Sequence, residues 1–365
     1  MPTVFFAFRD APERRAVLDV RGALDRYRLF GLDEIVTRGA TVRHNLERGG
    51  VPRWARGVSR ALNRVLRLAG GYGGDFASVL ASLRAASEAD VVFATADTVG
   101  IPLVLLKRAG LLRAPLVYVS IGLPERLVQL RGKRMRRFYS RAFRRVAALI
   151  AYSEAEAEWL RGELGDAAPP VRFVPFGVDT TEFSPDRVKD ENVDVVSVGA
   201  DPHRDFALLC TVAGRRPEWR FLIVAGKGHA PVLADAPANV VLESDLPLED
   251  TRDRLAGGRV VALPVRRNSY SGATTVLLQA MALGKPVVVS LTDAIARGYG
   301  LEDGVNCRLV PPGDADALEQ VLVETLADSR SLGLHARETV ERHLTWDSYT
   351  GALWEILSDA WAHEP

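Results

Sequence analysis

The sequence predicts an α/β protein built from two doubly wound domains, each with a parallel sheet that carries helices on both faces. Two observations support this fold class. Short apolar runs typical of buried strands alternate with helical segments along both halves of the chain. A length of 365 residues also exceeds what one hydrophobic core usually supports. We expect the ligand site in the central cleft between the domains, at the carboxyl ends of the strands.

The composition is that of an ordinary globular protein, with 47% hydrophobic and 25% charged residues. The net charge of +1 argues against nucleic acid as a partner. Two distant cysteines, Cys210 and Cys307, are typical of a reduced cytoplasmic protein rather than a disulfide scaffold. No apolar run reaches the length of a signal peptide or a membrane span. The excess of arginine over lysine suggests a bacterial genome rich in GC.

The first domain opens with an apolar strand at residues 4–8, and Pro12 suits the first turn of the helix that follows. A second strand at 41–43 ends in His44 and Asn45, where the strand ends of such a sheet face a ligand. His44 is therefore a candidate acceptor-side residue. The alternative is that His44 only caps a loop.

Residues 51–70 predict a basic amphipathic helix, because the arginines recur at steps of three and four. Such a helix can lie on an anionic membrane. We favour the alternative of a solvated arginine face, since the apolar face must also cover the core of the domain. The arginines are Arg53, Arg56, Arg60, Arg64 and Arg67.

A buried-type strand at 90–94 precedes the loop that holds Asp97, and a helix is expected at 101–109. Asp97 lies at the carboxyl end of the strand, so it is a candidate to contact a hydroxyl of a sugar or an acceptor. It is equally suited to cap the helix. The next strand, at 116–119, ends at Ser120.

The most basic run of the chain covers residues 131–145. It can bind an acidic lipid headgroup or an anionic acceptor, although a solvated helix surface explains the same pattern. No nucleic-acid-binding motif accompanies this charge. We therefore expect at most peripheral membrane contact, through residues 51–70 and 131–145.

Strands at 148–152 and 171–175 complete the first half, and Ser153 suits the N-cap of the helix between them. Pro185 and a run of mixed charge mark residues 183–192 as a linker. The second half resumes the alternation of strands and helices. Its strands are expected at 193–198, 221–224, 240–242, 260–263, 287–289 and 308–310.

These elements define the domain boundaries. A last helix, rich in large apolar side chains, must dock on another part of the protein, and we expect it to dock back onto the first domain. The assignments are residues 1–182 for the N-terminal domain, 183–192 for the linker, 193–345 for the C-terminal domain and 346–365 for the terminal helix.

Common ligand-binding motifs are missing from this sequence. Neither half has an intact Gly-x-Gly-x-x-Gly turn after its first strand, which argues against a dinucleotide dehydrogenase. There is no Gly-x-x-x-x-Gly-Lys-Ser/Thr loop, and no His/Cys cluster has metal-ligand spacing. We therefore predict no cofactor and no metal.

Residues 268–290 predict a small polar loop, a helix and a buried strand. Gly272 permits a sharp turn before the helix, and Gly284 ends it. The helix begins near Thr274 with unpaired backbone N–H groups at the positive end of its dipole, an arrangement that binds phosphate. An ordinary loop–helix–strand unit of an α/β core is the alternative.

Three stretches of the chain resemble GT-B glycosyltransferases, most closely glycosyltransferase family 4. Residues 152–185, with Val174-Pro-Phe-Gly-Val-Asp and a later Phe-Ser-Pro, are similar to the family's "VPNGVD…F.P" segment. Residues 197–206 are similar to its strand–Gly–basic loop, and 268–290 to its Glu-x7-Glu segment followed by "EAMAxGxPVV". The resemblance implies two Rossmann-like domains, an acceptor-side domain first and a nucleotide-sugar donor domain second.

The resemblance also implies which residues hold the donor. Its diphosphate would lie at the helix start, where positive charge stabilises it as the leaving group without a divalent metal. Arg204 would supply a fixed charge and Lys227 a further one, while a plain surface charge is the alternative for Arg204. The donor-binding set is Gly199, Arg204, Ser271, Gly272, Ala273, Thr274, Thr275 and Gln279; the catalytic set is Arg204, Lys227 and Asp97; the acceptor-side set is His44, Asp97 and Ser120.

The chain departs from the family at both glutamates of the Glu-x7-Glu pair. Ser271 stands at the first, which tends to contact the donor sugar, and Gln279 stands at the second, which grips the ribose hydroxyls. Gln279 can still exchange hydrogen bonds with a diol, although without charge. In the first half, Ser120 stands roughly where many relatives have a histidine.

We therefore predict an enzyme that moves a sugar from a nucleotide-diphosphate sugar to a hydroxyl of a small-molecule or lipid-linked acceptor. The resemblance implies retention of the anomeric configuration and no cofactor besides the donor itself. Two alternatives stay open. One is a nucleotide-sugar epimerase or hydrolase with the same fold, and the other is a catalytically inactive protein that binds nucleotide sugars.

Overall fold

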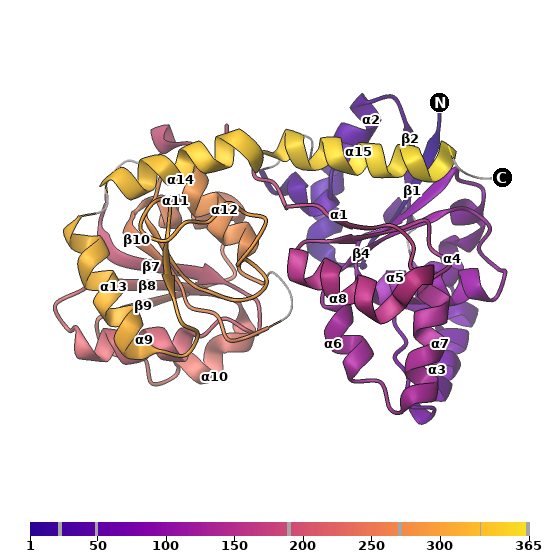
Figure 1. The fold of residues 1–365 in the computed structure, drawn as a ribbon, viewed down its shortest axis with the longest axis horizontal. Coiled ribbons are helices and arrows are strands. Elements are labelled where there is room, and N and C mark those ends of the chain that lie inside the picture. Colours follow the sequence, from indigo (N-terminus) through magenta and orange to yellow (C-terminus); the bar gives the residue numbers. More distant parts are fainter. Residues whose placement is uncertain (21–23, 48–49, 188–190, 269–271, 329, 363–365) are drawn as a thin grey trace. The chain divides into compact units, whose positions relative to one another are not determined.

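The computed structural model of the chain describes residues 1–20, 24–47, 50–187, 191–268, 272–328 and 330–362. The chain divides into two compact units, Met1–Val174 with Thr350–Pro365, and Pro175–Tyr349. Each unit contains one parallel sheet accompanied by helices (Figure 1). The predicted α/β class with two doubly wound domains is thus confirmed.

The sheet of the first unit has the strand order β2-β1-β3-β4-β5-β6, and all neighbours are parallel. Strands β3, β4 and β5 are buried at every position, as helices on both faces of a sheet require. The strands are β1 (Thr3–Ala7), β2 (Thr41–His44), β3 (Val91–Ala94), β4 (Leu116–Ser120), β5 (Ala148–Ala151) and β6 (Val171–Phe173).

The helices of the first unit begin where local sequence favours them. Pro12 opens α1, and the hydroxyl of Ser153 caps α8 by accepting a hydrogen bond from Glu156 N–H at 3.3 Å. No helix within the described residues is long and apolar enough to span a bilayer. The helices are α1 (Pro12–Asp19), η1 (Leu24–Leu29), α2 (Leu32–Thr37), η2 (Asn45–Glu47), α3 (Arg53–Leu68), α4 (Phe76–Ser87), α5 (Asp97–Arg108), α6 (Leu123–Val128), α7 (Lys133–Phe143), α8 (Glu154–Leu164) and η3 (Gly165–Ala167).

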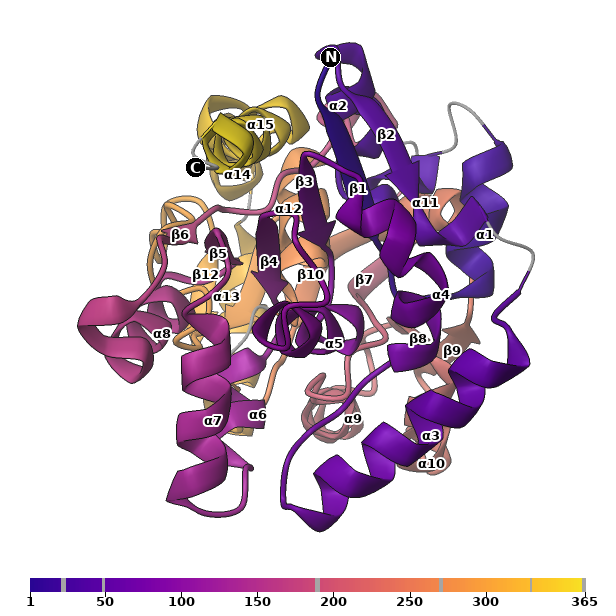
Figure 2. The same cartoon turned by 90° about the vertical axis from the view of Figure 1, so that its right-hand side faces the viewer.

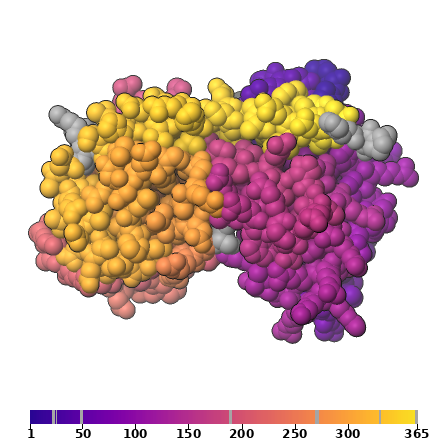
Figure 3. All heavy atoms as spheres, viewed as in Figure 1, coloured from indigo at the N-terminus to yellow at the C-terminus, as the bar shows by residue number. Residues whose placement is uncertain are grey.

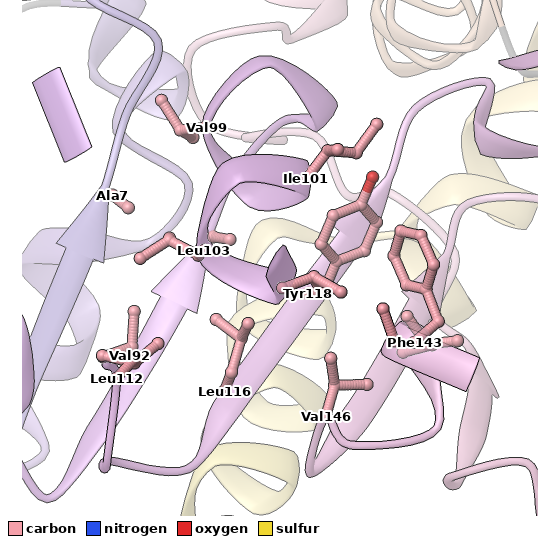
Figure 4. Packing of buried hydrophobic residues seen from close by; sticks show 14 of the residues in the cluster. Ala7, Val92, Val99, Ile101, Leu103, Leu112, Leu116, Tyr118, Phe143 and Val146 are labelled. Carbon is pink, nitrogen blue, oxygen red and sulfur yellow. The ribbon is translucent and has the colours of Figure 1, made fainter. Parts of the chain in front are cut away.

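Apolar side chains from the sheet and its helices form the core of the first unit. Tyr118 on β4 packs edge-on against Phe143 of α7, with ring centroids 5.2 Å apart. Figure 4 shows the Tyr118 ring among these apolar residues with its oxygen pointing away from Val146 and Leu116. The Tyr118 hydroxyl therefore leaves this apolar core and donates a hydrogen bond to Asp97.

The sheet of the second unit has the order β12-β11-β10-β7-β8-β9, and again every pair is parallel. The helix α9 packs against α13, and α12 against α14. The strands are β7 (Val193–Gly199), β8 (Phe221–Ala225), β9 (Val240–Ser244), β10 (Gly258–Leu263), β11 (Val287–Ser290) and β12 (Arg308–Val310). The helices are η4 (Pro185–Arg187), α9 (Phe206–Arg215), η5 (Lys227–His229), α10 (Ala230–Leu233), α11 (Leu248–Ala256), α12 (Thr274–Ala282), α13 (Ala315–Ala327) and α14 (Arg330–His343).

The chain leaves the first unit after Val174, earlier than the linker expected at 183–192. The segment that follows is bonded into the second unit. Val178 N–H donates to the carbonyl of Leu344 at 2.9 Å, and the Arg337 guanidinium donates to two further carbonyls of the segment. These long-range bonds, which local composition does not reveal, join residues 175–182 to the second unit.

The last helix, α15 (Trp346–Ala362), begins in the second unit and belongs to the first unit from Thr350 onward. It packs closely there, because a β-carbon at Gly31 would lie 3.0 Å from Thr350 and 3.5 Å from Leu353. Figure 3 shows the yellow atoms of this helix along the surface of the first unit. The terminal helix is thus docked on the first unit over most of its length.

Candidate donor and acceptor site

The start of α12 has the features of a phosphate site. Its N-cap residue is Ala273, whose side chain has no acceptor for the N–H groups of the first turn. The first intrahelical bond runs from Leu277 N–H to the Ala273 carbonyl at 3.0 Å. The N–H groups of Thr274 and Thr275 therefore have no intrahelical acceptor. The Thr274 hydroxyl is buried and has no partner among the described residues. The predicted donor residue Ser271 lies outside the described residues.

Arg204 follows β7 and is enclosed, with 1% of its surface exposed. Its Nη2 donates to the Ser197 hydroxyl at 3.2 Å, whereas Nε and Nη1 have no partner among the described residues. Burial lowers the pKa of Arg204 to about 10, so the guanidinium remains charged at neutral pH. A buried charge with unsatisfied donors is unfavourable unless an anion pairs with it. The alternative of a plain surface charge for Arg204 is wrong.

Neighbouring loops hold Arg204 in place. The next residue, Asp205, donates its N–H to the Pro264 carbonyl after β10 at 2.9 Å. Gly199 makes room for the guanidinium, because a β-carbon there would lie 2.6 Å from Nε. The guanidinium carbon also lies 5.6 Å from the centroid of the Phe206 ring. The cation is therefore positioned by the fold and not by a flexible surface loop.

The loop of Arg204 also touches the start of α12. A β-carbon at Gly272 would lie 2.8 Å from the carboxylate carbon of Asp201, so a larger residue would separate the two segments. The Asp201 carboxylate accepts a hydrogen bond from His203 N–H at 2.8 Å. Gly199, Arg204 and the helix start thus lie at one edge of the second sheet. A fixed cation beside a helix N-terminus suits a phosphate-bearing ligand.

The structure places Lys227 differently from Arg204. Its side chain is 86% exposed, and its ammonium lies 3.0 Å from the carboxylate of Asp245. The neighbouring His229 is buried instead, with Nε2 at 2.9 Å from the Asp201 carbonyl and its ring edge-on to Phe206. The structure does not bring the Lys227 ammonium to the enclosed guanidinium, and its catalytic role stays a prediction.

Two amide side chains complete this edge. Gln279 lies in the second turn of α12 with 4% of its surface exposed, and its contact with a ribose stays a prediction. Asn268 was not singled out by the sequence analysis. Both of its amide atoms are buried without a partner among the described residues. Its only sequence signal is its place at the start of the polar loop.

In the first unit, Asp97 is enclosed at the carboxyl edge of the sheet. Its oxygens accept hydrogen bonds from the Tyr118 hydroxyl at 2.5 Å, Ile121 N–H at 3.3 Å and Arg126 Nε at 2.7 Å. Burial raises the pKa of Asp97, although these three donors oppose the shift. The alternative that Asp97 caps α5 is wrong. The N-cap of α5 is Ala96, Asp97 is the first residue of the helix, and no N-cap side chain bonds to the N–H groups of the first turn. Asp97 instead holds Arg126 in place.

Ser120 shares this edge with Glu156, which the sequence analysis missed. The Ser120 hydroxyl donates to Glu156 Oε1 at 2.5 Å, and Gly122 N–H donates to the same oxygen at 3.3 Å. Burial raises the pKa of Glu156 to about 8, so its carboxyl is largely protonated near neutral pH. The Ser153-x-x-Glu156 spacing predicts a capping box, whereas the structure bonds this carboxyl to the end of β4.

His44 ends β2 at the same edge of the first sheet. Its ring lies edge-on to Phe8, its Nε2 lies 3.7 Å from a Glu47 oxygen, and its Nδ1 is buried without a partner among the described residues. Burial lowers the pKa of His44, which favours the neutral imidazole. The adjacent Asn45 is structural, because its amide bonds the backbone of Phe8 in both directions, at 2.8 and 2.9 Å.

Acidic and histidine residues do not gather into a metal site in the part of the chain that the structure describes. The one Asp-x-Asp sequence of the chain is structural. Asp314 caps α13 by accepting from Ala317 N–H at 2.9 Å, and Asp316 pairs with Arg215 at 2.7 Å. Within the described residues, Arg204 and the start of α12 supply positive charge at this edge of the second sheet.

Family models match both units of the chain. Residues 27–182 match the model described as Glycosyltransferase Family 4, and residues 191–328 match that of Glycosyl transferases group 1. A search of curated protein sequences gave no match.

Solved structures share the fold over the whole chain at low sequence identity. Sucrose-phosphate synthase from Thermosynechococcus elongatus has a TM-score of 0.76 at 16% identity and covers 100% of both chains. HepE of Anabaena, in complex with UDP and glucose, has a TM-score of 0.70 at 18% identity over 98% of this chain and 100% of its own. A glycosyltransferase from Rickettsia africae reaches 0.63 at 11% identity, covering 100% and 99%. With both units matched by family models, the chain belongs to the GT-B glycosyltransferases of family 4, group 1.

Proposed function

We propose that the protein transfers a glycosyl group from a nucleotide-diphosphate sugar to a hydroxyl of an acceptor. The observation that carries this proposal is the enclosed Arg204 guanidinium, which has two donors without partners among the described residues. It lies in the loop that touches the start of α12. HepE, which shares the fold, was solved with UDP-glucose, and this supports a nucleotide sugar as the ligand.

The chemistry at this edge is the stabilisation of a leaving group. When the glycosidic bond to the donor breaks, negative charge develops on the diphosphate. Arg204 and the N–H groups at the start of α12 offset this charge in an environment of low dielectric, where such interactions are strong. The proposal requires no divalent metal, because these groups supply the positive charge.

We propose further that the reaction retains the anomeric configuration without a strong protein base. In the first unit, Asp97 is held by Tyr118 and Arg126, and Glu156 is favoured in its protonated form. Neither carboxyl is therefore free to take a proton from an acceptor near neutral pH. In a front-face reaction, the departing phosphate oxygen can accept that proton instead, so neither of these two carboxyls is needed as a base.

We also propose that α3 and α7 of the first unit contact an anionic membrane, which would carry a lipid-linked acceptor. The apolar face of α3 covers the core only in part, because Leu62 and Leu66 are half-buried whereas Trp54, Val58 and Val65 are exposed. All five arginines are exposed, as the favoured interpretation of a solvated arginine face predicted. Figures 1 and 2 show α3 and α7 at the same end of the first unit. Exposed apolar and basic side chains together favour a lipid-linked acceptor.

A groove on α7 adds to this basic surface. It has a volume of about 370 Å³ and one acidic residue, Glu163, which pairs with Arg136. The groove is lined by Lys133, Arg136, Arg137, Ser140, Arg141, Arg144 and Glu163. The remaining cations can contact anionic headgroups.

The donor proposal is tested by binding and turnover with UDP-, GDP- and dTDP-sugars. Arg204→Met keeps much of the side-chain volume but removes the charge, so we expect nucleotide-diphosphate affinity to fall at least about tenfold, as for loss of a charged hydrogen bond. Arg342→Met, at an exposed position on α14, is the matched control. Circular dichroism confirms that each variant is folded. The proposal fails if no donor of the panel binds, or if Arg204→Met binds nucleotide like the wild type.

Turnover separates the activities that share this fold. Transfer to an acceptor, with the product anomer read by NMR and the rate unchanged by a chelator, supports the proposed reaction. Release of free nucleotide without an acceptor would identify a hydrolase, and binding without turnover would identify an inactive homologue.

Membrane contact is tested separately, by co-sedimentation with vesicles. We expect binding to vesicles that contain anionic lipid and not to neutral ones, and reduced binding for the Arg60→Glu/Arg64→Glu variant. Arg220→Glu/Arg342→Glu, at two exposed positions of the second unit, serves as the control for the same change in net charge. Equal binding of the Arg60→Glu/Arg64→Glu variant and the control would remove α3 from the contact surface.

A further inference from the structure

A cavity of about 550 Å³ lies at the amino-terminal edge of the first sheet. Its floor comes from the residues that lead into β4, β5 and β6, and the C-terminal helix α15 forms one wall. It is lined by Lys107, Pro115, Arg145, Val146, Ala147, Ala148, Pro170, Arg172, Ile356, Asp359 and Ala360. Its volume is within the range of roughly 300–1,000 Å³ that is usual for small-molecule sites.

The cavity and the candidate acceptor residues lie at opposite edges of one sheet. Pro115 immediately precedes β4, whereas Ser120 ends the same strand. Because all strands of this sheet are parallel, the entries to β4, β5 and β6 share one edge and Ser120 and Asp97 share the other. A ligand of this cavity is therefore separate from the donor and acceptor of the proposed transfer reaction, and the inference does not rest on that function.

The lining combines an apolar interior with a positive rim. Apolar side chains such as Val146 and Ile356 form much of the wall. Arg145 and Arg172 are exposed, and within the described residues their side chains make no hydrogen bond or ion pair. Asp359 is the one acidic residue of the lining. An apolar interior beside two unpaired guanidinium groups selects for a negative charge attached to an apolar body.

Lys107 adds a further cation, although its ammonium is partly engaged. Its Nζ donates to the carbonyls of Arg113 at 3.1 Å and Ala114 at 2.8 Å, which fixes the side chain near the entry to β4. The lining therefore holds three basic residues against one acidic residue. This excess of positive charge disfavours a cationic amphiphile and does not favour a neutral one.

We propose that this cavity is a binding site for one small amphiphilic anion, a phosphate or carboxylate on an apolar body. The headgroup pairs with Arg145 and Arg172, and the apolar body fills the space between the sheet edge and Ile356 and Ala360 on α15. Such a ligand joins α15 to the sheet. Hydrogen exchange of the backbone amides in the last two turns of α15 therefore slows when the ligand binds.

Decyl phosphate, below its micellar concentration, is the probe for this site. We expect it to bind the full-length protein with a stoichiometry of one in isothermal titration calorimetry. Decanoate is expected to bind as well, since it carries the same kind of charge. Three other compounds are expected to bind at least about tenfold more weakly. Decyl maltoside and decyltrimethylammonium lack a negative charge, and inorganic phosphate lacks an apolar body.

Variants locate the site. Arg145→Gln/Arg172→Gln removes both guanidinium groups at exposed positions and is expected to weaken decyl phosphate binding at least about tenfold. Ala360→Trp on α15 fills the cavity and is expected to block binding of decyl phosphate and decanoate alike. Arg60→Glu on α3 is the control for binding to the basic surface of that helix. Thermal unfolding and circular dichroism show whether each variant keeps the wild-type fold.

The proposal is supported if anionic amphiphiles bind preferentially, the Arg145/Arg172 variant loses this preference and α15 exchanges more slowly in the complex. It is overturned if decyl maltoside binds as tightly as decyl phosphate, or if the Arg145/Arg172 variant binds like the wild type. It is also overturned if Arg60→Glu abolishes binding while the cavity variants retain it, since α3 would then be the site.

Discussion

Replacing Glu156 by glutamine is expected to stabilise the first unit, and increasingly so as the pH rises. Glutamine keeps the shape of the side chain, and its oxygen can accept the hydrogen bonds that Ser120 and Gly122 donate to Glu156 Oε1. The substitution removes a carboxyl group whose ionisation is unfavourable in a buried environment. The native hydrogen bonds are thus retained while the pH dependence of this residue disappears.

The magnitude follows from a pKa of about 8 for Glu156 in the folded protein against an ordinary value of 4.5. The folded state holds this proton more tightly than the unfolded chain does. Its stabilising contribution is therefore complete below the ordinary pKa and is lost as the pH rises through the folded value. Between about pH 6 and about pH 8, the linkage relation predicts that the wild type loses roughly 2 kcal/mol of unfolding free energy relative to the glutamine variant.

Hydrogen exchange measured by mass spectrometry at increasing urea concentrations can follow this change within one unit. Peptides from β4 and β5 report the unfolding free energy of the first unit in wild type and Glu156→Gln at both pH values. Glu355→Gln, at an exposed position of α15, is the control. A difference between wild type and Glu156→Gln that does not change from pH 6 to pH 8 would refute the reasoning.

Two further predictions concern close packing and thiol reactivity. Gly100→Ala is expected to lower the stability of the first unit by about 1–3 kcal/mol, because its β-carbon would lie 2.2 Å from the Tyr118 ring; thermal unfolding measures this, and an unchanged midpoint would contradict it. Burial raises the pKa of both thiols, that of Cys307 to about 12, so iodoacetamide should modify the half-buried Cys210 before the buried Cys307. Peptide mass spectrometry against time shows the order, and equal rates would contradict it.

The sequence alone determined the fold class and the local form of the loop and helix at α12. Strands such as β3 and β11 are apolar at every position because both faces of a parallel sheet are covered. This pattern is local and can be read without a structure. The same holds for α12, because small residues precede the helix and Gly284, which adopts a positive φ of 68°, follows it.

Only the tertiary structure decided the environment of the charged groups. The sequence marked Arg204 and Asp97 correctly as residues at strand ends, but one guanidinium proved fully enclosed and one carboxylate proved to be held by Arg126. The sequence did not mark Glu156 as a site residue, because its partner Ser120 is distant along the chain. These contacts depend on strand order, which places the ends of β4 and β5 side by side. Burial and pairing set the pKa of each group, and neither is encoded in local spacing.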